Sequence, residues 1–298
     1  MFLNKNITVI FITRTQIKSA VFSLEGKIKK EMKIYGWTKD SLSGVLRDIA
    51  ARGPARTRVV FGEEFSYVMA LPMQERKKEN MLEQVQEKIP EYIATNWDFK
   101  KERSSETQLQ VAAIQPEIMD IFETEFMKAG LNIESIEPQS VALARLLPEK
   151  GFHLFIAADE KILLGVINDG TVEIAYVALQ EEIIDKVEKF LAYVRKKTAQ
   201  EPQTIFVGGN INTEAEFFQK NNIPIKIMEL DALRGTALKE NISGEDEKVL
   251  NVRKQKTNSF NDENRLKKSG MSQREKWLLF IFVAFIAITI GVVFRYKF

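Results

Sequence analysis

The chain has 298 residues, a formal net charge of +2 and no cysteine. This length is enough for one large domain or two lobes, each with a real core. The near-zero net charge and the lack of a stripe of basic and aromatic residues in the body argue against nucleic-acid binding. The absence of cysteine agrees with a reducing compartment.

The first part of the chain predicts three strands, a helix and a further strand. Short apolar runs indicate the strands, and Glu25-Gly26 is typical of the second turn between them. Apolar residues at helical spacing indicate the helix, which Gly53-Pro54 ends. The predicted elements are the strands Ile7–Ile12, Ser19–Leu24 and Lys27–Tyr35, a helix from about Lys39 to Arg52, and the extended run Thr57–Phe61.

An insertion subdomain is predicted at about residues 67–138, with helices and a strand of its own. Its first helix is expected from about Gln74 to Asn96, with Pro90 disturbing the last turns. Leu109–Ile114 is a predicted strand. Pro116 is expected to open a second helix, which runs through Ala129 and stops at Gly130.

The second half repeats the order of the first: three strands, a helix and a strand. Asn168-Asp169-Gly170 is a strong hairpin turn between two of the strands. This repetition predicts two related α/β lobes within residues 1–240. The predicted elements are the strands His153–Ala158, Ile162–Ile167 and Thr171–Val177, a helix over about Glu181–Lys197, the strand Gln203–Val207, a short helix opened by the capping box Thr213/Glu216, the strand Ile223–Met228 and a helix from Asp231 to about Leu238.

The end of the sequence predicts a membrane anchor. Residues 241–276 are polar, charged and nearly free of aromatic residues, which is typical of a disordered linker. From Trp277 to Phe294 the chain is apolar and uncharged, so residues 277–294 are expected to form one transmembrane helix in contact with lipid. Basic residues dominate just before this span, and the positive-inside bias therefore predicts that the large N-terminal body is cytoplasmic.

Several motifs resemble the PilM family, the actin-like cytoplasmic proteins of type IV pilus machinery. Leu71-Pro72-Met73, the helix ending in QEKIPEYI (Gln86–Ile93) and Trp97-Asp98-Phe99 are similar to the family segment "LPxM … E..KYIP … DY". The stretch Val111–Leu147 is similar to its "AA…VD.Y…L..AGL….D…AL" segment. The resemblance covers roughly residues 7–238 and extends more distantly to FtsA. The expected membrane-anchored layout of the chain resembles that of GspL. It implies an α/β protein of the actin-like ATPase fold, with two duplicated ribonuclease-H-like lobes and an inserted subdomain.

The resemblance also implies a nucleotide site that this sequence retains only in part. Aligned on Lys18, the first phosphate loop has Phe11 where the family has a metal-binding aspartate, and Ile156 stands at the corresponding position of the second loop. The turn Gly208-Gly209 with Asn210 is similar to the family's adenosine-contacting turn. Lys18, Gly208, Gly209 and Asn210 are therefore the candidate residues of a degenerate nucleotide site, with residual ATP binding left open, and the chain is expected to be a pseudo-ATPase.

No other catalytic or metal-binding arrangement stands out in the sequence. The single histidine, His153, opens an apolar strand, and a zinc site would need all-carboxylate ligation. The resemblance implies a non-catalytic scaffold of an inner-membrane type IV pilus or type II secretion-like platform, which binds a cytoplasmic peptide of a PilN-like membrane protein. Two alternatives remain open: an ATP-binding or ATP-hydrolysing actin-like protein with relocated metal ligands, and an unrelated membrane-tethered adaptor.

Overall fold

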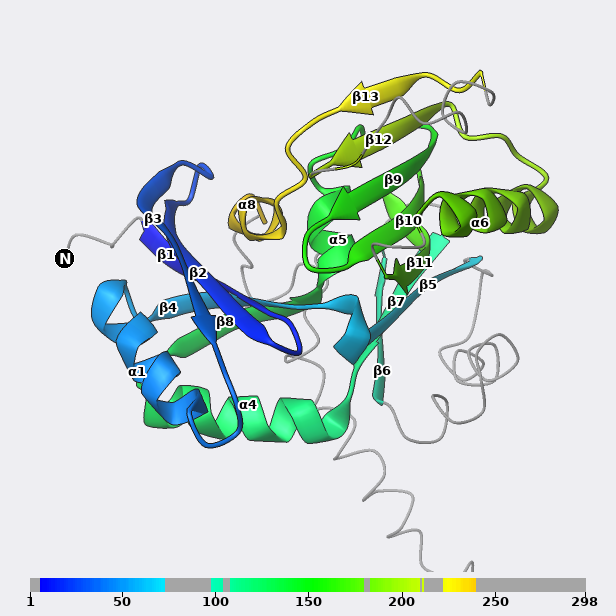
Figure 1. Ribbon diagram of the computed structural model, residues 1–298. Helices are drawn as coiled ribbons and strands as arrows, with labels where there is room; N and C mark the ends of the chain where they lie inside the picture. The colour runs from blue at the N-terminus through cyan, green and yellow to red at the C-terminus, as the bar shows by residue number, and fades with distance from the viewer. Residues whose placement is uncertain are drawn as a thin grey trace, which may run out of the picture. The chain divides into compact units, whose positions relative to one another are not determined.

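The computed structural model describes residues 6–72, 98–103, 108–179, 183–209, 211 and 222–239 of the chain. The chain divides into two compact units, Met1–Arg253 and Lys254–Phe298, and every described residue belongs to the first. Figure 1 shows two groups of strands in this unit, with helices packed against them.

Some predicted elements lie outside the described residues. These are the helix Gln74–Asn96, the capping pair Thr213 and Glu216, the linker 241–276 and the membrane span 277–294. Among the residues that the structure does describe, no helix is long and apolar enough to cross a membrane. The predicted span therefore stays a prediction.

A five-stranded sheet forms the first lobe, in the order β3-β2-β1-β4-β8 (Figure 1). The first three strands pair antiparallel, as the sequence predicts, whereas β4 and β8 run parallel to β1. Alternate apolar side chains of β1 face opposite sides of the sheet, which gives the lobe a core on each face. The strands are β1 Asn6–Ile12, β2 Gln16–Ser23, β3 Ile28–Gly36, β4 Arg56–Phe61 and β8 Asn132–Pro138.

Two helices, α1 (Leu42–Arg52) and α4 (Pro116–Lys128), pack against one face of this sheet. The ring of Phe122 on α4 contacts that of Phe61 on β4, with 5.4 Å between the ring centroids. Helix α1 begins three residues later than predicted, because the backbone of Thr38 accepts and donates hydrogen bonds in a turn before the helix.

An eight-stranded sheet forms the second lobe, in the order β13-β12-β9-β10-β11-β5-β7-β6. The predicted meander is present as β9, β10 and β11, and both Asp169 (φ 46°) and Gly170 (φ 78°) in its last turn adopt the left-handed conformation. Helix α6 (Ile183–Thr198) packs against this sheet. The strands are β9 Phe152–Ala158, β10 Ile162–Asn168, β11 Thr171–Ala178, β12 Thr204–Gly208, β13 Ile225–Ile227, β5 Ser66–Pro72, β7 Gln108–Ile114 and β6 Asp98–Arg103.

The segment predicted as an insertion, residues 67–138, differs in one respect from a separate subdomain. Its strands β5, β6 and β7 extend the second sheet, whereas α4 and β8 complete the first lobe. Strand β8 pairs parallel with β4, and parallel neighbours need a long crossover, which α4 supplies. The described end of this segment, α4 and β8, therefore lies in the first lobe.

Two short helices, α5 (Gln139–Ala144) and α8 (Ala232–Ala237), cross beside the first sheet. They meet at Gly235, where a Cβ atom would lie 2.0 Å from the carbonyl oxygen of Ala142. Asp231 caps α8 by accepting a hydrogen bond from the Leu233 amide, which agrees with the predicted helix start. One apolar core joins both helices to the two sheets, and the hairpins described below are placed by it.

Candidate functional site

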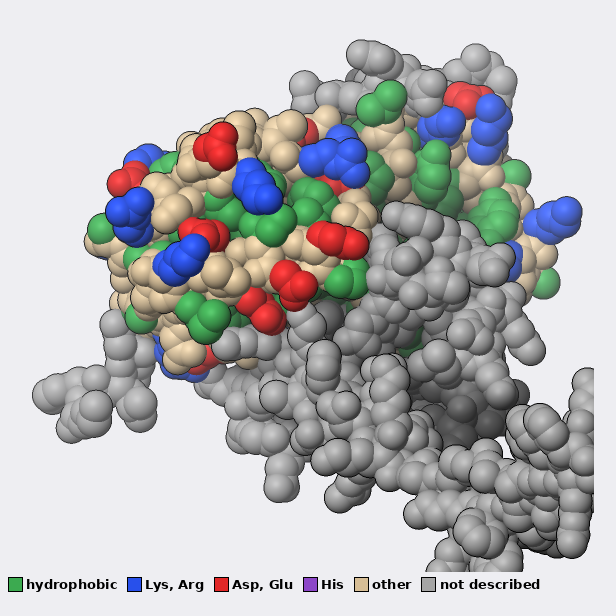
Figure 2. All heavy atoms as spheres, turned by 90° about the horizontal axis from the view of Figure 1, so that it is seen from below, with side chains coloured by type: hydrophobic (Ala, Val, Ile, Leu, Met, Phe, Trp, Pro, Cys, Tyr) green, Lys and Arg blue, Asp and Glu red, His purple; other side chains and the backbone are tan. Residues whose placement is uncertain are grey.

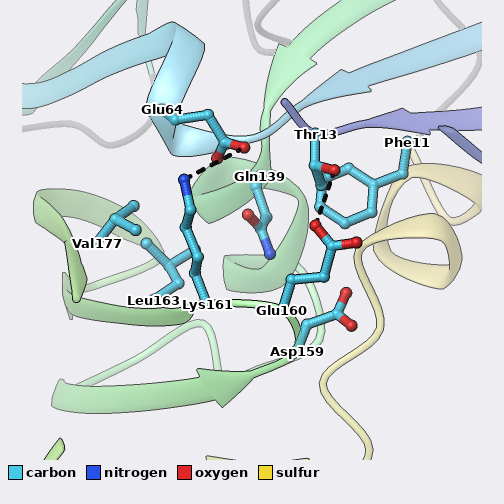
Figure 3. A pocket seen from close by; sticks show the side chains of 9 residues that line it. All are labelled: Phe11, Thr13, Glu64, Gln139, Asp159, Glu160, Lys161, Leu163 and Val177. Atoms are coloured by element: carbon cyan, nitrogen blue, oxygen red, sulfur yellow. Dashed lines mark hydrogen bonds and ion pairs between the residues drawn. The ribbon is translucent and has the colours of Figure 1, made fainter. Parts of the chain in front are cut away.

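Two hairpin turns at equivalent places in the duplicated lobes face one another. The first is Thr13-Arg14-Thr15 between β1 and β2, and the second is Asp159-Glu160-Lys161 between β9 and β10. Figure 3 shows the Glu160 carboxylate pointing toward Thr13, and Lys161 pointing toward Glu64. The cavity beside them is lined by Phe11, Thr13, Glu64, Gln139, Asp159, Glu160, Lys161, Leu163 and Val177.

Side chains of the chain itself join these two turns. The Thr15 hydroxyl donates to Glu160 Oε2 at 2.7 Å, and the Thr13 hydroxyl donates to the same oxygen at 3.2 Å. Next to them, the buried ammonium of Lys18 forms an ion pair with Asp159. A carboxylate from the second lobe therefore accepts hydrogen bonds from two hydroxyl groups of the first turn.

Glu64 makes a further link between the two turns. Its carboxylate accepts a hydrogen bond from the Arg14 amide at 2.9 Å and lies 3.9 Å from Lys161 Nζ. Its neighbour Glu63 is buried, and burial raises the pKa of its carboxyl, although the Ser140 amide donates to it at 2.9 Å. Glu63 thereby accepts a hydrogen bond from a backbone amide at the start of α5, which has no partner within the helix. This contact holds α5, whose residue Gln139 lines the cavity.

The sequence resembles a family that has metal-binding aspartates at two positions. In this chain both positions hold apolar, buried residues. Phe11 is 4% exposed and lines the cavity, whereas Ile156 is fully buried in the core of the second lobe. Within the described residues, no group of three or more acidic, histidine or cysteine side chains could hold a metal ion. The cavity has a volume of about 20 Å³. That is room for roughly one water molecule, whereas small-molecule pockets measure about 300–1,000 Å³.

The predicted glycine turn has a packing role that the structure makes clear. Gly209 has a φ of +85°, and a Cβ atom on it would lie 2.0 Å from the carbonyl oxygen of Ala158. A Cβ atom on Gly208 would lie 2.5 Å from Leu230 Cβ. Both glycines are therefore needed for close contact within the chain. Asn210 lies outside the described residues.

Two of the predicted site residues, Lys18 and Gly209, lie at the turn after β9. Lys18 contacts Asp159, and Gly209 contacts the preceding residue, Ala158. The sequence alone does not identify Glu64, Asp159 or Glu160 as site residues. The duplication could have indicated the last two, because it makes the turn after β9 equivalent to the turn after β1.

Charged side chains on the face shown in Figure 2 are mixed in sign. Lysine and arginine alternate with aspartate and glutamate over the part of the first lobe that the structure describes. A phosphate backbone is bound by a patch or stripe of basic residues, and this face presents none among the described residues.

Comparison with solved structures identifies the fold. Over 78% of its length the chain matches 92% of the cytoplasmic domain of EpsL, an inner-membrane component of the type II secretion system of Vibrio cholerae, with a TM-score of 0.55 and 10% identity. The match to the PilM–PilN type IV pilus biogenesis complex covers 78% of this chain and 97% of that chain, with a TM-score of 0.56 and 12% identity. A Bacteroides thetaiotaomicron protein with an actin-like ATPase fold and unknown function matches at a TM-score of 0.55 and 11% identity, covering 79% of this chain and 96% of that one.

The chain therefore has the actin-like ATPase fold, in the form that PilM-like and EpsL-like proteins share. This confirms the predicted resemblance at the level of the fold. No model of a protein family matches the sequence, and no curated protein matches it. At these identities the likeness defines the fold, and activity has to be argued from the site.

Proposed function

We propose that this protein is a non-catalytic scaffold of an inner-membrane assembly platform of the type IV pilus or type II secretion kind. The observation that carries the proposal is the closure of the site between the two hairpin turns. Glu160 occupies the hydroxyl donors of Thr13 and Thr15, and Asp159 occupies the ammonium of Lys18. A nucleotide would have to displace these contacts, and Phe11 and Ile156 supply no carboxylate for its metal ion.

The proposal includes attachment to the membrane. The uncharged run 277–294 forms a single transmembrane helix, and the basic residues before it keep residues 1–240 on the cytoplasmic side. EpsL, whose cytoplasmic domain has the same fold, is an inner-membrane component of a secretion system, which supports this arrangement. The lipid contacts of the scaffold are made by this helix.

The partner in this proposal is a membrane protein with a short cytoplasmic peptide. A PilM protein of the same fold has been solved in complex with PilN, which supports a PilN-like partner for this chain. Other components of the same platform would assemble on the body. Binding a peptide needs a stable surface rather than turnover, and a body whose lobes are held together without a ligand provides one.

The experiment is a comparison of nucleotide turnover and partner capture by the full-length chain. Purified in mild detergent, the parent, Lys18→Ala and the matched surface variant Lys29→Ala should show the same background hydrolysis of ATP with Mg²⁺. Cross-linking in native membranes should recover a single-span membrane protein, joined through its cytoplasmic segment. Hydrolysis that disappears in Lys18→Ala but not in Lys29→Ala would instead establish the alternative, an ATPase with relocated metal ligands. Recovery of no membrane protein would contradict the scaffold.

A further inference from the structure

The strand pair β5–β7 joins the two lobes. Phe65, just before β5, and Ile114, at the end of β7, are buried in the core of the first lobe that α1 and α4 cover. From there β5 runs to the side of β11 and enters the sheet of the second lobe (Figure 1). The seam between β11 and β5 is therefore a joint between the lobes, in addition to the two hairpin turns.

The backbone ladder across this seam is short. Among the described residues, β11 and β5 are in register at one pair, Ile174 with Met69. By comparison, β5 and β7 are in register at seven successive pairs. A ladder of one pair supplies few of the backbone hydrogen bonds that hold neighbouring strands together, so other groups have to supply the rest.

An extra residue in β11 lies where this ladder ends. Val166 of β10 lies opposite Ile174, but the next residue of β10, Ile167, lies opposite Val172. Glu173 is therefore the extra residue of a β-bulge, which bends the strand that carries it. The register between β11 and β5 ends at the same point, so Val172 has no residue of β5 opposite it.

The side chain of Gln110, on β7, takes the place of this backbone partner. The Val172 amide donates to Gln110 Oε1, and the Val172 carbonyl oxygen accepts from Gln110 Nε2, both at 2.9 Å. The same Nε2 donates to the carbonyl oxygen of Met69 on β5 at 3.1 Å. Gln110 is 3% exposed and Val172 is fully buried. Without this side chain, two backbone groups of Val172 would therefore lose their partner away from water.

A second side-chain contact crosses the seam beside Gln110. The carboxylate of the bulged residue, Glu173, accepts hydrogen bonds from Gln108 of β7 and from Asn168 of β10, both at 2.9 Å. Glu173 is partly exposed, in contrast to the buried Gln110. The seam is therefore held by side-chain hydrogen bonds on both sides of the bulge.

We propose that the seam between β11 and β5 is a releasable joint between the lobes, and that Gln110 is the clasp that keeps it shut. The hydrogen bonds of Gln110 depend on distance and angle, so a small rotation of one lobe breaks them. The apolar contacts of Val68 and Ala112 in the shared core are non-directional and persist through such a rotation. With the clasp in place the two lobes form one body, and with the clasp released the second lobe turns at the seam.

Distances between spin labels test the proposal, because the chain contains no cysteine and labels can be attached at chosen positions. Met127→Cys on α4 with Lys196→Cys on α6 reports the distance between the lobes, and Lys196→Cys with Ile227→Cys reports a distance within the second lobe. All three positions are exposed. In the full-length chain in mild detergent, the parent should give one dominant interlobe distance. Gln110→Met keeps the length of the side chain and removes its hydrogen bonds. It should raise the population of a second interlobe distance about tenfold or more, since each lost hydrogen bond shifts such an equilibrium by roughly two- to tenfold.

Two further variants complete the test. Gln115→Met is the matched control: this glutamine donates to the Glu64 carbonyl oxygen on the first-lobe side of the seam, so its loss should leave the interlobe distance unchanged. Glu173→Ala, at the partly exposed position, should raise the second distance severalfold, and it decides the matter if Gln110→Met does not fold. An interlobe distance that neither seam variant changes, or that Gln115→Met changes equally, would overturn the proposal. An equal change in the pair within the second lobe would also overturn it, because it would show a general loosening of the fold.

Discussion

The clearest energetic prediction concerns Glu137, a fully buried carboxylate at the end of β8. Arg145 donates two hydrogen bonds to it, at 3.0 and 2.8 Å, and the Thr236 hydroxyl donates a third at 2.7 Å. The ammonium of Lys239, which is also fully buried, lies 3.0 Å away. Burial alone would raise the pKa of Glu137, but Arg145 and Lys239 lower it from 4.5 to about 2.

The substitution Glu137→Gln should lower the free energy of unfolding by about 3 kcal/mol at pH 7, the value that corresponds to this difference in pKa. A folded-state pKa below the unfolded value means that the stabilisation is complete above about pH 5 and is lost as the pH falls toward about 2. The difference between parent and variant should therefore shrink over this window. The exposed carboxylate of Glu25 provides the control, and Glu25→Gln should change little at any pH.

Urea unfolding of the full-length chain in mild detergent, followed by tryptophan fluorescence between pH 3 and 7, measures both effects. Adding Lys239→Met to Glu137→Gln should restore part of the loss, because it removes the ammonium that is left buried without its counter-ion. A loss below about 1 kcal/mol at pH 7, or an equal loss at pH 3 and pH 7, would refute this account of the ion pair.

Two further predictions concern packing. Gly235→Ala should destabilise the fold by about 1–3 kcal/mol, because its Cβ would meet the Ala142 carbonyl, whereas Gly44→Ala in α1 meets no atom within 4 Å and should stabilise it by about 0.5–1 kcal/mol. Phe122→Ala should cost about 3–5 kcal/mol, since the ring is buried, and the half-exposed Tyr193→Ala should cost far less. Thermal unfolding of the four variants checks both, and equal shifts within either pair would contradict the packing argument.

Part of each sheet follows from local patterns, whereas the strands β5, β6 and β8 are not among the predicted elements. Strands β9, β10 and β11 are marked by apolar runs, and the turn Asp169-Gly170 needs two positive φ angles, which these residue types adopt readily. The start of α8 follows in the same way from Asp231, whose side chain caps the helix. Such features depend on a few neighbouring residues, and the sequence therefore contains the information directly.

The buried charges could not be predicted in this way. Arg58, Glu137 and Lys239 come from distant parts of the chain, and each residue type is normally found at the surface. The ion pair between Lys18 and Asp159 likewise joins two lobes that only the fold brings together.

The closed site and the buried cluster lead to one conclusion about how this body works. Contacts within the chain join the two hairpin turns. Here Glu160 and Asp159 supply them, and the ion pair of Glu137 with Lys239 fixes α8 against the first lobe. Because neither set of contacts needs a bound molecule, the relation between the lobes is set by the chain itself. This supports the scaffold function that we propose.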